Sequence, residues 1–287
     1  MDRISSPKRT KEIVQKYGFR FSKSLGQNFL IDRNILESIV DGADITKEDC
    51  VIEVGPGIGS LTQNIAERSD SVVAIEIDKT LIPILEETLS EYSNVEVINE
   101  DVLKLDLHKL VEEKFKDKKP KVIANLPYYV TTPIIMKFLE EKVPVHSLTI
   151  MIQKEVADRM QAKPCTKDYG ALSIAVQYYC NPKILLKVPP SVFIPQPKVE
   201  STVIRLDILE EPRVYVERED IFFSLVKDAF GKRRKTLLNA LSSGDMKLDK
   251  DLLREVLSLS GIDESRRGET LNIEEYGRLA NNLAKRL

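Results

Sequence analysis

The chain has 287 residues and a formal net charge of −2; 42% of its residues are hydrophobic and 31% are charged. This length suits one large domain and a small one, and the balanced charge excludes a bulk polycation. No apolar run approaches the roughly 18 residues of a membrane span, and the first residues lack the apolar segment of a signal peptide. We therefore expect a cytoplasmic protein that does not enter membranes.

Cysteine and histidine are scarce, and this limits the chemistry. The three cysteines are widely spaced and form neither a zinc pattern nor a disulfide framework, and Cys50 opens an apolar run typical of a core strand. His108 and His146 have no partner pattern around them, so we expect them at the surface or at a strand edge. We expect no metal site and no catalysis by histidine.

Positive charge gathers in two segments. Residues 1–23 hold seven Lys or Arg against two acids, a local charge of +5, and residues 232–235 read Lys-Arg-Arg-Lys. Charge runs are most often solvated faces. Two basic segments on an acidic body also fit a localised footprint for a polyanion.

Short apolar runs alternate with helical patterns between residues 50 and 152. The pattern predicts strands at 50–54, 72–75, 95–98, 121–124 and 148–152, with helices at 59–68, 79–90, 107–117 and 131–141. Such alternation predicts a parallel, doubly wound sheet covered on both faces. Ligands bind outside the carboxyl ends of such strands, where Gly55, Glu76, Asp101 and Asn125 fall.

The pattern changes after this region. Strand-like runs at 184–188 and 199–206 flank a Pro-rich stretch, and helical periodicity then dominates 219–241, 249–259 and 272–286. We therefore predict an α/β domain over 1–210, which includes a basic arm and a first cofactor motif over 1–33. A small all-helical domain is predicted over 211–287.

A glycine-rich turn follows the first strand of this region. Gly55 and Gly57 permit a tight turn and close backbone approach to a ligand, and Glu76 ends the second strand, where an acid takes ribose hydroxyls. A dinucleotide fingerprint would need glycine at position 60, where the chain has Ser60. Glu53, just before the turn, disfavours a pyrophosphate and suits a cationic, phosphate-free cofactor such as S-adenosylmethionine (SAM), unless it serves to hold loop N–H groups.

Two further loops follow strand ends. Asp101 could accept from an adenine amine, or it could cap a helix. Asn125 and Leu126 offer an amide oxygen and a carbonyl that can accept both protons of an exocyclic amine, while Pro127 donates nothing. Tyr128 offers a stacking face. The alternative for this tetrapeptide is a strand-end turn with a half-buried tyrosine.

Several segments together resemble the KsgA/RsmA family of ribosomal RNA adenine dimethyltransferases, in order and from about residue 20 to the C-terminal helices. The matching segments are residues 24–30, 53–62, 125–128, 153–160, 169–170, 188–193 with Pro195, Pro197 and Ser201, and 230–237.

The resemblance implies a Rossmann-like SAM-dependent methyltransferase domain with a C-terminal helical RNA-binding domain. It implies that Glu76 holds the ribose and Asp101 the adenine amine of SAM, and that Tyr128 and Phe193 sandwich the substrate base. The substrate would be two adjacent adenosines in a hairpin near the 3′ end of small-subunit rRNA, giving N6,N6-dimethyladenosine, with a monomer acting on the small ribosomal subunit and not on DNA. The implied SAM contacts are Asn28, Leu30, Gly55, Gly57, Glu76, Asp101 and Asn125.

Three alternatives remain. The related large-subunit rRNA adenine methyltransferases of the macrolide-resistance type share the same motifs. A non-catalytic RNA-binding assembly factor could keep a vestigial pocket, although the intact segment 125–128 argues against it. A nicotinamide oxidoreductase lacks support at Ser60.

Overall fold

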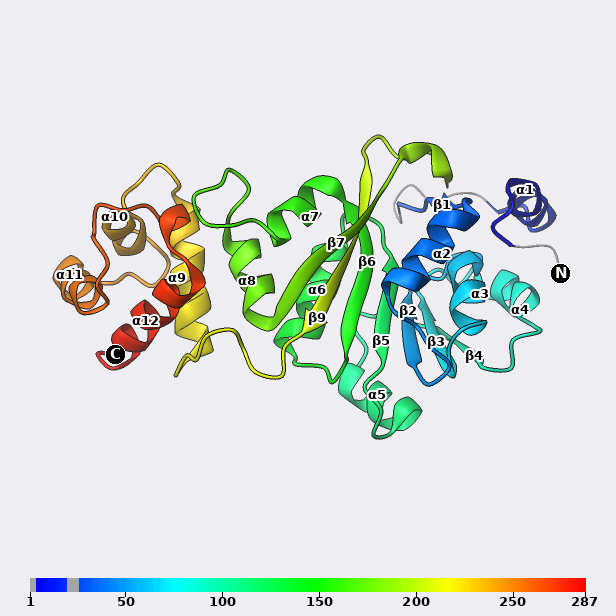
Figure 1. Ribbon diagram of the computed structural model, residues 1–287, viewed down its shortest axis with the longest axis horizontal. Helices are drawn as coiled ribbons and strands as arrows, with labels where there is room; N and C mark the ends of the chain where they lie inside the picture. The colour runs from blue at the N-terminus through cyan, green and yellow to red at the C-terminus, as the bar shows by residue number, and fades with distance from the viewer. Residues whose placement is uncertain (1–3, 20–25) are drawn as a thin grey trace. The chain divides into compact units, whose positions relative to one another are not determined.

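The computed structural model describes residues 4–19 and 26–287 (Figure 1). The chain divides into two compact units. The first comprises Met1–Ala157 and Lys183–Ile208, and the second comprises Asp158–Pro182 and Leu209–Leu287. No helix in these described ranges is long and apolar enough to cross a membrane.

A seven-stranded sheet forms the centre of the first unit (Figure 1), with the strand order β4-β3-β2-β5-β6-β9-β7. Its strands, in chain order, are β2 (Cys50–Val54), β3 (Ser71–Glu76), β4 (Val95–Asn99), β5 (Lys121–Asn125), β6 (Ser147–Gln153), β7 (Cys180–Val188) and β9 (Ser201–Ile208). Strands β4, β3, β2, β5 and β6 pair in parallel, whereas β9 runs antiparallel to β6. The sheet is therefore mixed.

The parallel sheet predicted for residues 50–152 is confirmed by β2 to β6, and the later strand β9 adds to it in the antiparallel direction. The chain passes from β7 to β9 through the Pro-rich segment, which holds only a 3₁₀ turn (η1, Pro190–Val192) and the short strand β8 (Phe193–Ile194). Parallel neighbours need a crossover of a dozen or more residues, usually a helix, and this connection offers none.

Helices of the first unit flank the sheet, and several start at a side-chain cap. Asp32 caps α2 by accepting from the Ile35 N–H, and Asp106 caps α5 in the same way. The apolar face of α2 enters a core with the fully buried strand residues Val51 and Ile123. These helices are α2 (Arg33–Gly42), α3 (Ser60–Ala66), α4 (Ile82–Thr88), α5 (Leu107–Phe115) and α6 (Thr131–Glu140).

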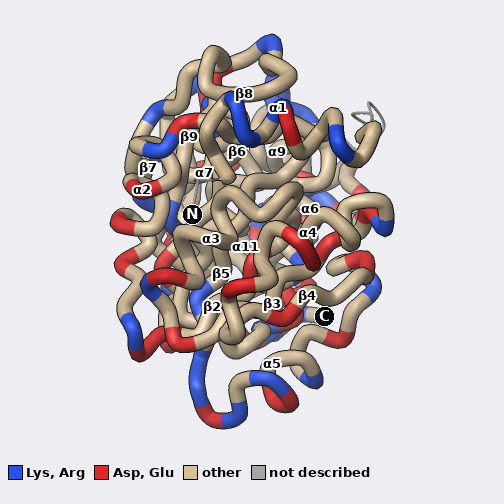
Figure 2. Tube along the Cα trace, turned by 90° about the vertical axis from the view of Figure 1, so that its right-hand side faces the viewer, with Lys and Arg blue, Asp and Glu red and all other residues tan. Residues whose placement is uncertain are grey.

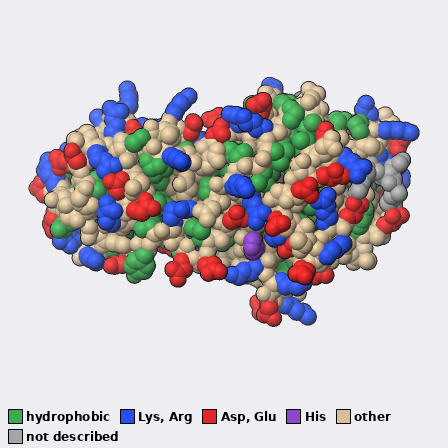
Figure 3. Space-filling model, in the orientation of Figure 1, with side chains coloured by type: hydrophobic (Ala, Val, Ile, Leu, Met, Phe, Trp, Pro, Cys, Tyr) green, Lys and Arg blue, Asp and Glu red, His purple; other side chains and the backbone are tan. Residues whose placement is uncertain are grey.

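Part of the basic arm is a helix, α1 (Pro7–Lys16). Its Ile13 is buried with residues of α4, and Lys16 pairs with Glu87 of α4 at 2.6 Å. The predicted cations at positions 3, 20 and 23 lie outside the described residues. Basic and acidic positions are interspersed along the trace in Figure 2 and over the face shown in Figure 3.

The second unit is helical. It contains α8 (Ala171–Tyr179), α9 (Glu219–Gly231), α10 (Leu237–Ser242), α11 (Lys250–Leu259) and α12 (Ile273–Ala284); α7 (Lys154–Met160) crosses the division between the units. The helix predicted over 219–241 is two helices, because α9 ends at Gly231 and the side chain of Thr236 caps α10. The four cations 232–235 lie in this break.

Residues 158–182 belong with the C-terminal helices, whereas the sequence placed them with the α/β domain. The ring of Tyr178 in α8 packs at a tilt against that of Phe222 in α9, with the ring centroids 5.0 Å apart. The Tyr169 hydroxyl donates to the Leu271 carbonyl at 2.9 Å. Sequence periodicity does not detect such contacts, since the partners are 44 or more positions apart.

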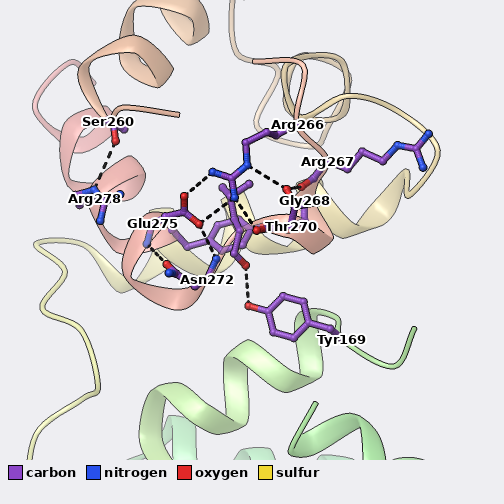
Figure 4. Close-up of polar contacts among 11 residues, drawn as sticks. Tyr169, Ser260, Arg266, Arg267, Gly268, Thr270, Asn272, Glu275 and Arg278 are labelled. Carbon is purple, nitrogen blue, oxygen red and sulfur yellow. Dashed lines mark hydrogen bonds and ion pairs between the residues drawn. The ribbon is translucent and has the colours of Figure 1, made fainter. Parts of the chain in front are cut away.

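A local polar network closes the segment before α12 (Figure 4). The Arg266 guanidinium donates to the Glu275 carboxylate at 2.5 Å and to the Thr270 carbonyl at 2.6 Å. Glu275 also accepts from the main chain of Asn272, whose side chain caps the helix in return. This reciprocal capping box fixes the start of α12.

Candidate active site

All ten residues predicted to act in binding or catalysis line a single cavity of the first unit. Its empty volume is about 1140 Å³ including the open mouth, which is ample for a nucleoside cofactor and a second ring. The ten residues are Asn28, Leu30, Gly55, Gly57, Glu76, Asp101, Asn125, Leu126, Tyr128 and Phe193.

The glycine turn after β2 requires glycine for two reasons. Gly55 and Gly57 have φ values of 73° and 62°, in the left-handed region that strains other residues. A Cβ on Gly57 would also lie 3.2 Å from the Phe29 ring. The turn therefore exposes bare backbone to the cavity.

Glu76 ties this turn to the end of β3. Its carboxylate accepts from the Gly57 N–H at 3.2 Å and from the Asp78 N–H at 2.8 Å. Burial raises the pKa of Glu76 to about 7, although these two N–H donors act in the opposite direction. Each carboxylate oxygen retains a lone pair that can accept from ligand hydroxyls.

Glu53 lies beneath the turn and is 1% exposed. Burial raises the pKa of Glu53 to about 8, and the nearby carboxylate of Glu76 adds to the effect. Its Oε2 has no hydrogen-bond partner among the described residues. One interpretation of the sequence was that Glu53 holds N–H groups of the loop. In the structure it is Glu76 that accepts from the Gly57 N–H.

The charge of the cavity lining indicates the kind of cofactor that it can hold. The described lining contains four acids, Glu53, Glu76, Glu100 and Asp101, and no Lys, Arg or His. A pyrophosphate would place further negative charge against buried carboxyl groups. A sulfonium and an ammonium group would instead offset them, so the lining fits SAM.

A two-stranded ribbon links the first cofactor motif to the Pro-rich segment. Strand β1 (Phe29–Leu30) pairs antiparallel with β8, and Leu30 faces Phe193. The Phe193 side chain is 3% exposed and packs in the core cluster that contains Leu30. The Asn28 amide donates to the Gly26 carbonyl at 2.9 Å.

Asp101 caps a turn rather than a helix. Its carboxylate accepts from the Leu103 N–H at 3.0 Å, and Lys104 Nζ lies 3.8 Å away. The predicted contact to an adenine amine stays a prediction.

The segment 125–128 leaves the end of β5 as a closed turn. The Pro127 carbonyl accepts from the Val130 N–H at 3.2 Å and from the Thr131 hydroxyl at 3.0 Å. No described residue donates to the Asn125 side-chain oxygen or to the Leu126 carbonyl. Both acceptors are therefore available to a ligand.

Tyr128 is fixed through its hydroxyl, which lies 2.8 Å from the Ser201 Oγ of β9. The sequence did not assign a site role to Ser201 or to two other lining residues, Ile77 and Tyr129, which are 54% and 62% exposed. For Ile77 and Tyr129 the signal in the sequence was position, because Ile77 directly follows the end of β3 and Tyr129 directly follows the segment 125–128.

The basic segment 232–235 lies in the second unit and is exposed. Lys232 and Arg233 donate to main-chain carbonyls; Arg233 reaches that of Lys167 at 2.8 Å. The side chains of Arg234 and Lys235 have no hydrogen bond or ion pair with any described residue, although the Lys235 main-chain N–H donates to the Lys232 carbonyl at 2.9 Å. Only the second half of the segment is therefore free to bind a polyanion.

This fold and cavity define the chain as a Rossmann-like methyltransferase that uses SAM. The family model described as "Ribosomal RNA adenine dimethylase" matches residues 18–284, and the chain belongs to that family. It is therefore an enzyme, a SAM-dependent rRNA adenine dimethyltransferase, as the sequence resemblance predicted.

Similar proteins agree along the whole chain. It is 84% identical over 287 residues to "Ribosomal RNA small subunit methyltransferase A" of Alkaliphilus oremlandii (strain OhILAs), covering 100% of both. It is 73% identical to the protein of the same name from Alkaliphilus metalliredigens (strain QYMF), again covering 100% of both.

Two solved structures have the same fold. A dimethyladenosine transferase from Plasmodium falciparum matches with TM-score 0.77 at 25% identity, covering 90% of this chain and 98% of that one. The 23S rRNA methyltransferase ErmE matches with TM-score 0.66 at 26% identity, covering 89% and 99%.

Proposed function

We propose that this enzyme transfers methyl groups from SAM to N6 of two adjacent adenosines in a hairpin near the 3′ end of small-subunit rRNA. The product is N6,N6-dimethyladenosine. The observation that carries the proposal is the pair of unengaged acceptors at Asn125 and Leu126 in the acidic cavity. The small-subunit assignment is supported by the 84% identity to a protein of that name, against 26% to the 23S enzyme ErmE.

Activation of the amine is assigned to the turn after β5. An adenine amine is a poor nucleophile because its lone pair is delocalised into the ring. The Asn125 Oδ1 and the Leu126 carbonyl accept both N–H bonds, which favours a pyramidal nitrogen and frees the lone pair. The interaction is strongest in the transition state, where it accelerates the reaction.

No strong base is needed in this cavity. When bound, SAM supplies a methyl group already activated by its positive sulfur. Gly55, Gly57 and Glu76 would hold its nucleoside, and Glu53 would offset its positive charge. The nitrogen that gains the methyl group would release one proton to water, so one N–H remains and the amine must rotate or rebind before the second transfer.

The target base must leave its stack, which costs a few kcal/mol. A hairpin loop lowers that cost, and loops are where RNA is usually read by sequence. Tyr128 would stack on the base, with its ring held by Ser201. Phe193 would border the base from the Pro-rich segment, where it is already packed against Leu30.

The helical unit is assigned to RNA binding. Arg234 and Lys235 are exposed and unpaired within the described chain, so they can take phosphates. The partner is then the small ribosomal subunit, with the enzyme acting as a cytoplasmic monomer and not on DNA.

The test is incubation of the enzyme with labelled SAM and, in separate reactions, unmethylated small or large ribosomal subunits, followed by nucleoside analysis of the RNA. We expect label in N6,N6-dimethyladenosine. Label found only in large-subunit RNA would favour the macrolide-resistance type of activity, and absence of label in either RNA would refute the proposal.

A further inference from the structure

We propose that Tyr129 is a stacking platform at the mouth of the cavity, which holds the base adjacent to the one being methylated. This inference rests on the proposed function, because it needs a substrate with two neighbouring adenosines. It assigns separate tasks to the two consecutive tyrosines of the turn.

The two rings differ in exposure and in contacts. Tyr128 is half-buried, and its hydroxyl lies 2.8 Å from the Ser201 Oγ. Tyr129 also lines the cavity but is 62% exposed, and no described residue bonds to its hydroxyl. The Tyr128 ring is therefore held inside the cavity, whereas the Tyr129 ring is exposed to solvent at its rim.

Tyr129 stands on a closed turn, so the main chain that carries its ring is fixed before any ligand arrives. The Pro127 carbonyl accepts from both the Val130 N–H and the Thr131 hydroxyl, and α6 begins directly afterwards. The side of the turn is occupied by Gly26, with φ 57°. A Cβ there would lie 3.1 Å from the Pro127 Cβ and 3.6 Å from the Tyr129 Cε1.

The proposed substrate creates a need for such a ring. When one adenosine enters the cavity, the next one loses its stacking neighbour and is left at the mouth. An aromatic ring accepts any base, because every base has a π-face. Single exposed aromatic residues are common, but this one lies beside the two acceptors that would hold the reacting amine.

The experiment compares three variants on unmethylated small subunits under single-turnover conditions: Tyr129→Ala, Tyr129→Phe and a control, Tyr215→Ala. Tyr215 is a matched control because it is an exposed tyrosine (76%) that does not line the cavity and is not one of the cations assigned to phosphate binding. SAM affinity is measured for each variant by calorimetry, which also reports that the cavity is intact.

We expect Tyr129→Ala to lower kcat/KM by roughly 5- to 150-fold, equivalent to about 1–3 kcal/mol, with SAM affinity unchanged. Tyr129→Phe and Tyr215→Ala should stay near wild type. The proposal is overturned if Tyr129→Ala matches Tyr215→Ala, if Tyr129→Phe loses as much as Tyr129→Ala, or if SAM affinity falls together with turnover.

A second arm identifies the base that the ring contacts. Small subunits are reconstituted with an abasic nucleotide at one or the other of the two adjacent positions. In one of these two substrates the base that the Tyr129 ring would contact is missing. With that substrate, Tyr129→Ala should lower kcat/KM by no more than about twofold. A full effect in both would assign the ring to the reacting base and overturn the proposal. A wild-type enzyme that makes no dimethyladenosine would instead refute the proposed function.

Discussion

Replacement of Glu53 by glutamine should change how stability and cofactor affinity depend on pH. The wild-type carboxyl is fully buried and has a pKa of about 8, against the ordinary value of 4.5. Because the folded state binds its proton more tightly, stability is fully present below pH 4.5 and is lost as pH rises through 8. The difference between the pKa values of 4.5 and about 8 corresponds to at most about 5 kcal/mol of folding free energy.

Glutamine keeps the size of the protonated acid but does not titrate. In wild type, the titration of Glu76 also lowers the free energy of unfolding as pH rises toward its pKa of about 7. Between pH 7 and 8 Glu53 contributes most of the slope, so wild type should lose about 1 kcal/mol of stability over this interval that Glu53→Gln keeps.

The same carboxyl should link cofactor binding to protons. Positive charge beside Glu53 favours its ionised form, so SAM binding releases a proton and affinity rises from pH 6 to 8. In Glu53→Gln this rise should be reduced to the part contributed by Glu76. Denaturant unfolding across pH 6–9, and calorimetry in buffers of different ionisation enthalpy, measure the two effects. If the free energy of unfolding and the SAM affinity depend on pH equally in wild type and variant, Glu53 is not the titrating group.

Four further variants and one control test other parts of the mechanism and the fold. Asn125→Ala should keep measurable SAM affinity and lose methyl transfer by orders of magnitude; full activity would remove that residue from the mechanism. Gly57→Ala places a side chain on a residue with left-handed backbone and should cost about 1–3 kcal/mol of stability in denaturant unfolding. SAM binding should also weaken. An unchanged free energy of unfolding would contradict the proposal that this turn requires glycine. Arg234→Gln and Lys235→Gln should each reduce the salt slope of RNA binding by about 0.7–0.9, whereas the exposed control Lys109→Gln should not; equal slopes in all three would assign the segment to a solvated face.

The sequence predicted the cavity well because its residues follow strand ends. Period-two and period-3.6 patterns locate strands and helices, and parallel strands bring their carboxyl ends to one edge. Gly57, Glu76 and Asn125 are therefore found together although they are far apart in the chain. The pairing of Leu30 with Phe193 was not predicted, because strands of two residues leave no periodic signal.

The remaining differences have the same physical origin, which is long-range contact. The direction of β9, which the sequence pattern left open, and the placement of residues 158–182 with the helical unit depend on partners distant in sequence. The proton affinities of Glu53 and Glu76 likewise depend on burial, which a sequence pattern does not quantify. The sequence also could not show that the side chains of Lys232 and Arg233 bind main-chain carbonyls while those of the next two cations are free, because this depends on where each side chain lies.

The most direct test of the mechanism is a structure of the enzyme bound to a SAM analogue and an RNA hairpin with the target adenosine extruded. We expect the Asn125 Oδ1 and the Leu126 carbonyl oxygen each to lie within hydrogen-bond distance, about 2.7–3.2 Å, of adenine N6. An amine held elsewhere, with both oxygens turned away from the base and the methyl donor, would contradict this mechanism.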